Sequence, residues 1–397
     1  MRISTANTFD ASVDSLVRRQ SELATSQEQL TTGKRVNRAS DDPAAAARAE
    51  RALAAETHTD ATQRAVDASQ SAMTLSESAL GDASDLLQQI REAMVAAGNG
   101  TYSDSERKGV AEKIAGLRDQ LLAVANRQDG AGTYLFGGQA ADHAPFLDGA
   151  GGVSFQGAPG QINAASGDPL PLTVDGRAAW MSASTGNGVF VTTPTVSAGG
   201  AWVDSGHVTN PGAMTGSSYS LQFSVVGGVT TYSVLQDGAP TAMVGLPYTS
   251  GRAIEVDGLS ATVTGKPADG DQFDFTPSTT NLNLFDTLDK AVADLNTPLR
   301  TTSQIAQSNS THLAAIDAAM GQMQSVRSQV GETLNRIDSA TGRLSDLRLA
   351  SQTDRNNAEG LDMVKAISDF QNKQTGYDAA LKSYSLVQKM SLFNYIT

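Results

Sequence analysis

The sequence predicts a mainly α-helical protein in which both chain ends form a long antiparallel helical bundle or coiled coil, with an inserted β-rich outer domain. Three observations support this prediction. Apolar residues recur every seven positions near the N-terminus and again near the C-terminus, while between about residues 138 and 280 the helical period disappears and Gly, Thr, Ser and Val dominate. A seven-residue apolar repeat is the pattern that lets one helix wind along another.

The first helix is expected from residue 1 to about residue 32. Its seam consists of two interleaved rows, namely Phe9, Leu16, Leu23 and Leu30, with Val13, Gln20 and Gln27 between them. We interpret the glutamines as residues that set the register of pairing, at some cost in stability. The following stretch, TGKRVNRASDD, is expected to be a loop whose basic cluster of Lys34, Arg35 and Arg38 makes contacts.

A second helix is predicted to begin at Pro43 and to run to Ala97. Asp42 is a favourable N-cap, and proline fits the first helical position because its missing N–H would lack a partner there anyway. Gly98 and Gly100 end this helix. Along it the seven-residue step is kept by Val66, Met73, Leu80, Leu87 and Met94. Ser103 and Glu106 form a capping box, which predicts the start of the next helix.

The middle of the chain is predicted to be β-rich and solvent-facing. A β-hairpin is indicated by the strand-like segments SYSLQFSVV and VTTYSVL, which are joined by Gly227-Gly228. One further strand is indicated by the alternating pattern from Ala253 to Thr264. Residues 138–280 contain 3 basic and 11 acidic residues, a net of −8 within the chain total of −13.

Helical patterns return with a short helix from about Leu282 to Pro298 and a long one from about Thr301 towards Arg355. The final helix, from Leu361 onwards, repeats the seam of the first. Its two rows are Met363, Phe370, Tyr377 and Tyr384, and Ile367, Gln374, Leu381, Gln388 and Tyr395.

These patterns divide the chain into three expected parts. The terminal coiled-coil assembly domain comprises residues 1–40 and 360–397. The helical bundle comprises residues 41–137 and 283–359, and the outer domain comprises residues 138–282. The expected assembly interface comprises Phe9, Val13, Leu16, Leu23, Leu30, Met363, Ile367, Phe370, Tyr377, Leu381, Tyr384, Val387, Met390 and Phe393. An ordinary coiled coil within one molecule remains the alternative.

The sequence predicts no catalytic, cofactor or metal site. It has no Cys, none of its four His is followed by Glu as in a zinc helix, and it contains neither a P-loop nor a G-x-S-x-G elbow. Asp41 and Asp42 are better explained by helix capping than by a cation. The net charge of −13 argues against nucleic acid and anionic membrane as partners. The N-terminus lacks the pattern of a cleaved signal peptide.

Several stretches resemble the bacterial flagellin superfamily, and within it the branch that forms the hook–filament junction. They are MRIST at the start, QLTTGKRVNRASDDPAAAARA (29–49), NRQDGAGTYLFGG (126–138), NLFDTL (283–288), RSQVGETLNRIDSA (327–340) and ALKSYSLVQKMSLFNYI (380–396). They cover both helical flanks, about two-thirds of the chain. GKPADGDQFDF (265–275) is similar to segments in outer domains of hook-associated proteins.

The resemblance implies a structural protein of the bacterial flagellum that is exported unfolded through the type III channel. It implies assembly as a ring of copies between the first hook-associated protein and the flagellin filament. It also implies that a cytoplasmic chaperone binds the C-terminal helix, at about Leu361 to Tyr395, before export. The runner-up is flagellin itself, although the ending SLFNYIT lacks the Leu-Leu-Arg finish typical of flagellins. An enzyme displayed in the insert is the third class considered, and no constellation supports it.

Overall fold

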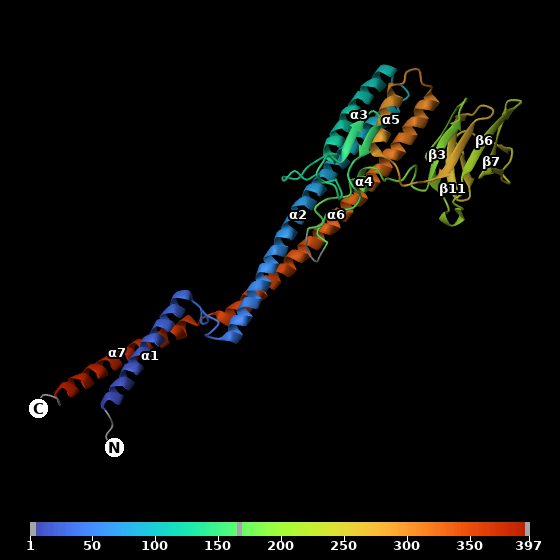
Figure 1. Ribbon diagram of the computed structural model, residues 1–397. Coiled ribbons are helices and arrows are strands. Elements are labelled where there is room, and N and C mark those ends of the chain that lie inside the picture. The colour runs from blue at the N-terminus through green and yellow to red at the C-terminus, as the bar shows by residue number, and fades with distance from the viewer. Residues whose placement is uncertain (1–4, 165–168, 394–397) are drawn as a thin grey trace. The chain divides into compact units, whose positions relative to one another are not determined.

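The computed structural model describes residues 5–164 and 169–393 (Figure 1). The chain forms two compact units. Unit 1 contains residues 1–64 and 340–397, and unit 2 contains residues 65–339. Two long helices, α2 (Pro43–Ala97) and α6 (Thr302–Glu359), contribute to both units. The predicted helical ends and the β-rich middle are both confirmed.

Unit 1 combines the start of α2 and the end of α6 with the two terminal helices, α1 (Thr5–Thr32) and α7 (Met363–Phe393). The predicted cap of α2 is present, because the N–H of Ala45 donates to Asp42 Oδ1 at 2.9 Å. The α2 face turned towards α6 carries small residues, with Ala45, Ala49 and Ala52 all buried.

In the helical part of unit 2, α3 (Asp104–Ala125) packs on α5 (Leu284–Asn296), and ion pairs such as Arg91–Asp317 join α2 to α6. The predicted apolar row of α2 is buried, and so are Ile316, Met323, Val330 and Ile337 of α6. Ser103 forms the predicted capping box with Glu106 at the start of α3. Seven-residue periodicity therefore identified the core of this part correctly.

An aromatic cluster closes the helical part of unit 2. It is built from a hairpin, β1 (Phe146–Gly149) and β2 (Gly152–Phe155), a short helix, α4 (Gly176–Trp180), and α5. Trp180 stacks on Phe285 with ring centroids 5.9 Å apart. The guanidinium of Arg118 on α3 ties the hairpin to α5, since it donates to Asp148 at 3.0 Å and to Asp289 at 3.2 Å. The first part of the predicted insert thus packs on helices.

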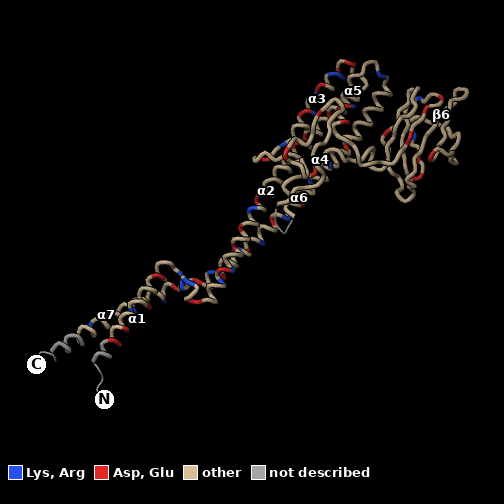
Figure 2. The backbone as a smooth tube through the Cα atoms, in the orientation of Figure 1, with Lys and Arg blue, Asp and Glu red and all other residues tan. Residues whose placement is uncertain are grey.

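The β domain consists of two antiparallel sheets around an apolar core that includes Leu221, Val263 and Phe273. One sheet contains β3 (Phe190–Val196), β12 (Gln272–Pro277), β6 (Tyr219–Val226), β7 (Val229–Gln236), β8 (Ala239–Pro240) and β9 (Leu246–Pro247). The other contains β10 (Ala253–Val256), β11 (Leu259–Lys266), β4 (Gly200–Val203) and β5 (His207–Val208). The short 3₁₀ helix η1 (Pro211–Ala213) lies between β5 and β6. The charges along the chain are drawn in Figure 2.

One strand prediction was wrong and the hairpin prediction was right. The hairpin forms as β6 and β7, which pair from Tyr219 with Gln236 to Val226 with Val229. The stretch predicted as one strand is two strands, β10 and β11, joined by a turn. Asp257 and Gly258 have φ values of 44° and 80°, which reverse the chain. A Cβ at position 258 would lie 2.1 Å from the Asn210 carbonyl oxygen, so glycine is required there.

Candidate functional site

The terminal pair, α1 and α7, lies side by side in unit 1 and holds the predicted interface (Figure 1). The two helices are antiparallel, because Arg19 lies against Gly376 while Ser26 lies against Lys373. Their near ends meet where the N–H of Leu361 donates to the Gly33 carbonyl at 3.1 Å. One face of each helix is therefore covered by the other helix.

The inward face of the terminal pair contains most of the first predicted row of each helix, together with Val13 of the interleaved row of α1. Half-buried residues of this face are Val13, Leu16, Leu23 and Leu30 of α1 and Phe370, Tyr377 and Tyr384 of α7. A residue period close to 3.5 keeps such a row facing the partner helix over its whole length. The structure thus brings these predicted residues together in one seam.

The polar residues of the seam differ from those predicted. Gln20, Gln27 and Gln374 are exposed, so their interpretation as register-setting residues is wrong. The polar contact is made instead by Lys373, whose ammonium donates to Ser26 Oγ at 2.7 Å, and Ser26 is only 5% exposed. A partly buried polar contact of this kind favours one register, because slipping the helices would leave the buried Ser26 hydroxyl without this partner.

The outward face of the terminal pair carries several apolar side chains that no described residue covers. Met363, Ile367 and Leu381 of the predicted interface are 45%, 46% and 41% exposed. Further exposed apolar residues on these helices are Val17, Val364 and Leu386. The side chains of the predicted residues Phe9, Val387, Met390 and Phe393 lie outside the described ones. Exposed apolar side chains gathered on one pair of helices are candidates for a protein–protein contact.

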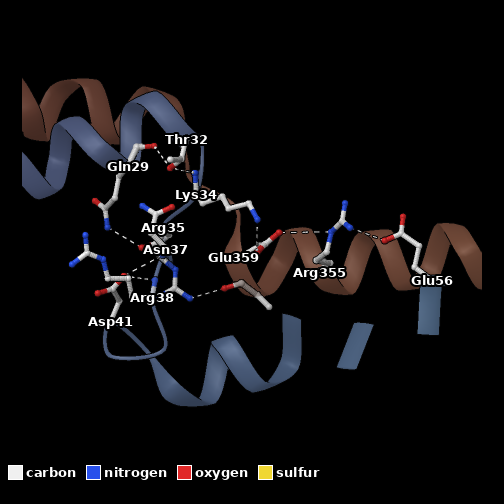
Figure 3. Close-up of polar contacts among 11 residues, drawn as sticks. Gln29, Thr32, Lys34, Arg35, Asn37, Arg38, Asp41, Glu56, Arg355 and Glu359 are labelled. Carbon is white, nitrogen blue, oxygen red and sulfur yellow. Dashed lines mark hydrogen bonds and ion pairs between the residues drawn. The ribbon is translucent and has the colours of Figure 1, made fainter. Parts of the chain in front are cut away.

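The joint, residues 33–42 with 358–362, connects the terminal pair to α2 and α6 within unit 1, and the predicted loop residues lie there (Figure 3). Lys34 pairs with Glu359 at 3.0 Å. Arg35 donates to the Ala358 carbonyl at 2.9 Å and pairs with Asp42 at 3.2 Å. Arg38 is the most exposed of the three and lies 3.5 Å from Glu28. Lys34 and Arg35 therefore fasten the loop after α1 to the end of α6, whereas Arg38 lies near α1 itself.

The carboxylates of the two aspartates in the joint accept hydrogen bonds from backbone N–H groups. Asp41 Oδ2 accepts the N–H groups of Asn37 and Arg38 at 3.1 and 2.9 Å. Asp42 caps α2, as predicted. Asp41 thus stabilises the turn before α2 and Asp42 caps the helix itself, which agrees with the capping interpretation.

Acid is expected to loosen the joint through Asp42. The N–H of Ala45 and then the Arg35 guanidinium lower the pKa of Asp42 below its ordinary value of 3.8. A carboxyl whose pKa is lowered by folding adds stability above its unfolded pKa and loses that contribution as pH falls through its folded pKa. The Ala45 amide resonance, followed against pH by NMR, should therefore shift with a midpoint below 3.8.

The control for this titration is Asp42→Asn, which keeps a side-chain acceptor for the cap but cannot lose a proton. This variant should show no midpoint at the Ala45 amide in the same pH range. A wild-type midpoint at or above 3.8 would contradict the assigned contacts.

Residues 5–164 and 169–393 offer neither a metal cluster nor a membrane span. No cluster of three His, Asp or Glu side chains there could hold a metal ion. No described helix is long and apolar enough to span a bilayer. Two of the histidines are paired with single aspartates, His143 with Asp142 and His312 with Asp294, both at 2.7 Å. His143 also contacts the Gln156 carbonyl at 3.2 Å, and Asp294 also lies 3.8 Å from Arg300.

Comparison with known proteins relates both helical flanks to one family. The N-terminal helical region of bacterial flagellin matches residues 3–141, and the C-terminal helical region of bacterial flagellin matches residues 313–396. Flagellar hook-associated protein 3 from Escherichia coli (strain K12) is 26% identical over 400 residues, which cover 99% of each chain.

A solved structure extends this similarity to three dimensions. The flagellar junction protein FlgL from Legionella pneumophila is 31% identical and superposes with a TM-score of 0.64, covering 70% of this chain and 94% of that one. Flagellin A from Vibrio cholerae serotype O1 is 30% identical over only 149 residues, 38% of this chain and 35% of the flagellin. Similarity over the whole length is thus found with the hook-associated protein, and similarity to that flagellin is limited to part of each chain.

Proposed function

This chain belongs to the family of flagellar junction proteins that includes flagellar hook-associated protein 3, and we propose that it is the adaptor joining the hook-associated ring to the flagellin filament. It is a structural component of the bacterial flagellum. The observation that carries the proposal is the terminal pair, whose inward face is closed by its own two helices while its outward face leaves Val364, Ile367 and Leu381 exposed.

The proposed mechanism is docking of the terminal pair. Within one molecule the seam holds α1 and α7 together, and the outward apolar face then buries against neighbouring subunits. Each large apolar side chain buried in this way contributes about 1.5–3 kcal/mol. In this proposal assembly is the role of residues 1–40 with 360–397, and the surrounding bundle is formed by residues 41–137 with 283–359. Within residues 138–282 the β domain would face outwards, while the β1–β2 hairpin and α4 pack on the bundle.

The proposed partners follow from the position of the adaptor. One face of a ring of copies would contact the first hook-associated protein, and the other would contact flagellin. Before export without a cleaved signal peptide, a cytoplasmic chaperone would bind residues 361–395, because an exposed amphipathic helix aggregates unless it is covered. The final location is extracellular, at the hook–filament junction, with neither nucleic acid, membrane nor cofactor as a partner.

The alternative that the chain is the filament subunit predicts a different distribution along the flagellum. Immunogold labelling of the β domain on isolated flagella tests this. An adaptor gives one narrow band where hook and filament meet, whereas a filament subunit gives label along the whole filament. The limited match to Flagellin A favours the adaptor.

A scaffold without enzymatic activity is also part of the proposal, and deletion of the β domain, residues 186–278, tests it. This cut leaves the β1–β2 hairpin and α4 on α5, and it joins Thr185 to Thr279, which a backbone hydrogen bond of 2.9 Å already holds together. If the insert has no essential chemical activity, cells making the shortened chain in place of the full one keep their filaments and swim. Intact flagella on non-swimming cells would instead indicate an active insert. Loss of the flagella would show that the insert is needed for assembly, which contradicts the placement of assembly in the terminal helices.

A further inference from the structure

A groove lies beside the joint within unit 1, between the start of α2 and the end of α6. It has a volume of about 460 Å³ and combines small side chains with charged and amide groups. Its lining residues are Arg48, Arg51, Ala52 and Ala55 of α2 and Ser351, Asp354, Asn357 and Ala358 of α6. The alanines leave space between the helices, and the two arginines place positive charge on one wall.

Arg48 and Arg51 form no ion pair among the residues that the structure describes, and Asp354 is the carboxylate that shares their groove. The Nε of each donates only to the carbonyl four residues earlier on its own helix, at 3.3 and 3.1 Å. The residues one turn further along, Ala52 and Ala55, are uncharged. Two like charges one turn apart on a helix repel each other by a few tenths of a kcal/mol. This groove therefore holds two arginines against one carboxylate, that of Asp354, and keeps a net positive charge.

The opposite arrangement occurs near the far end of α1. Asp10 and Asp14 are both exposed, lie four residues apart, and form no ion pair within the described ranges. About 20 residues of helix separate this acidic turn from Thr32 at the joint, which is about 30 Å at 1.5 Å per residue. The acidic turn and the groove beyond the joint therefore cannot meet within one molecule.

We propose that the Arg48–Arg51 groove receives the Asp10–Asp14 turn of a second copy of this chain. Both surfaces occur on every copy, and each would neutralise a like-charge pair that is unfavourable in the free molecule. The contact joins two different surfaces, so its repetition produces a ring or a helix rather than a closed dimer. The inference rests on the proposed function, because it supplies one of the contacts that hold copies together in the ring.

Cysteine cross-linking on isolated flagella tests this contact, since the chain contains no Cys of its own. The full chain would carry both Ala11→Cys and Ala47→Cys, two exposed positions beside the two charged turns. Cells would make this variant in place of the wild-type chain, and their flagella would be treated with a short bis-maleimide. Each single-cysteine variant serves as a control, and neither alone should give cross-linked dimers and larger species.

Charge reversal then tests whether the contact is electrostatic. Arg48→Glu with Arg51→Glu should reduce the cross-linked species by about tenfold or more, because facing like charges cost several kcal/mol. Adding Asp10→Lys and Asp14→Lys to the same chain inverts the pair and should restore the yield. Arg252→Glu with Lys266→Glu applies the same change of charge to exposed positions of the β domain and should leave the yield unchanged.

The outcomes separate this inference from the function on which it rests. We expect the double-cysteine chain to be present in flagella and to cross-link. We expect Arg48→Glu with Arg51→Glu to remove most of the cross-linking, and the further addition of Asp10→Lys and Asp14→Lys to restore it. The chain present in flagella without cross-linking, or with cross-linking that survives Arg48→Glu with Arg51→Glu, overturns the inference and leaves the adaptor function standing. A wild-type chain that is absent from isolated flagella overturns both.

Discussion

Leu381→Asp is expected to abolish incorporation of the chain into flagella while leaving α1 and α7 paired. Leu381 is 41% exposed on the outward face, so an aspartate there stays out of the seam. The same aspartate would place an unpaired charge where a neighbouring subunit buries the apolar face, at a cost of several kcal/mol. That cost corresponds to a loss of about a hundredfold or more in affinity. Immunoblots of isolated flagella measure the loss.

Leu16→Asp is expected to block incorporation by a different route. Leu16 is half-buried in the seam, so the charge would separate α1 from α7 and reduce the helix content of the free chain by circular dichroism, while the β domain stays folded. Ser383→Asp is the matched control, since Ser383 is exposed on α7 and already polar. Normal motility with either leucine variant would count against the assignment of the terminal pair as the assembly surface.

Phe285→Ala is expected to destabilise unit 2 more than any surface change. Phe285 is fully buried, and its ring lies 5.9 Å from the rings of Trp180 and Phe146. Removing it leaves a cavity between α5, α4 and the β1–β2 hairpin, and such a substitution lowers the free energy of unfolding by about 3–5 kcal/mol. Urea unfolding followed by tryptophan fluorescence measures the change.

The matched control for Phe285→Ala is Val226→Ala at the tip of the β6–β7 hairpin. Val226 is 74% exposed, so its truncation should change the free energy of unfolding by about 0.5 kcal/mol or less. If Phe285→Ala also changes it by less than about 1 kcal/mol, the aromatic cluster does not anchor the hairpin.

Much of the helical architecture could be predicted because the signals were local. Pro43 after Asp42 and the Ser103–Glu106 box placed two helix starts correctly, since capping depends on residues one turn apart. The turn within residues 253–266 also had a local signal, the Asp257-Gly258 pair, which is a favoured hairpin turn. That signal was sufficient to reveal two strands in place of one.

The details of the terminal pair could not be predicted in the same way. Both the inward and the outward face of α7 carry apolar residues, and periodicity alone does not say which row faces α1. Phe370 lies inward, whereas Ile367 lies outward and is 46% exposed. The partly buried hydrogen bond from Lys373 to Ser26 joins positions 347 residues apart. The hydrogen bonds from Arg118 to Asp148 and Asp289 also join segments that are distant in the sequence. Such contacts depend on the packed structure.

Seeded assembly is the most direct test of the central claim that this chain is a junction adaptor. The purified full chain would be added at high concentration to isolated hooks whose tips carry the first hook-associated protein, and growth would be followed by light scattering and electron microscopy. The adaptor account predicts that the chain decorates the hook tips and that growth stops there without long filaments. Continued growth into long filaments would identify a filament subunit and contradict the account.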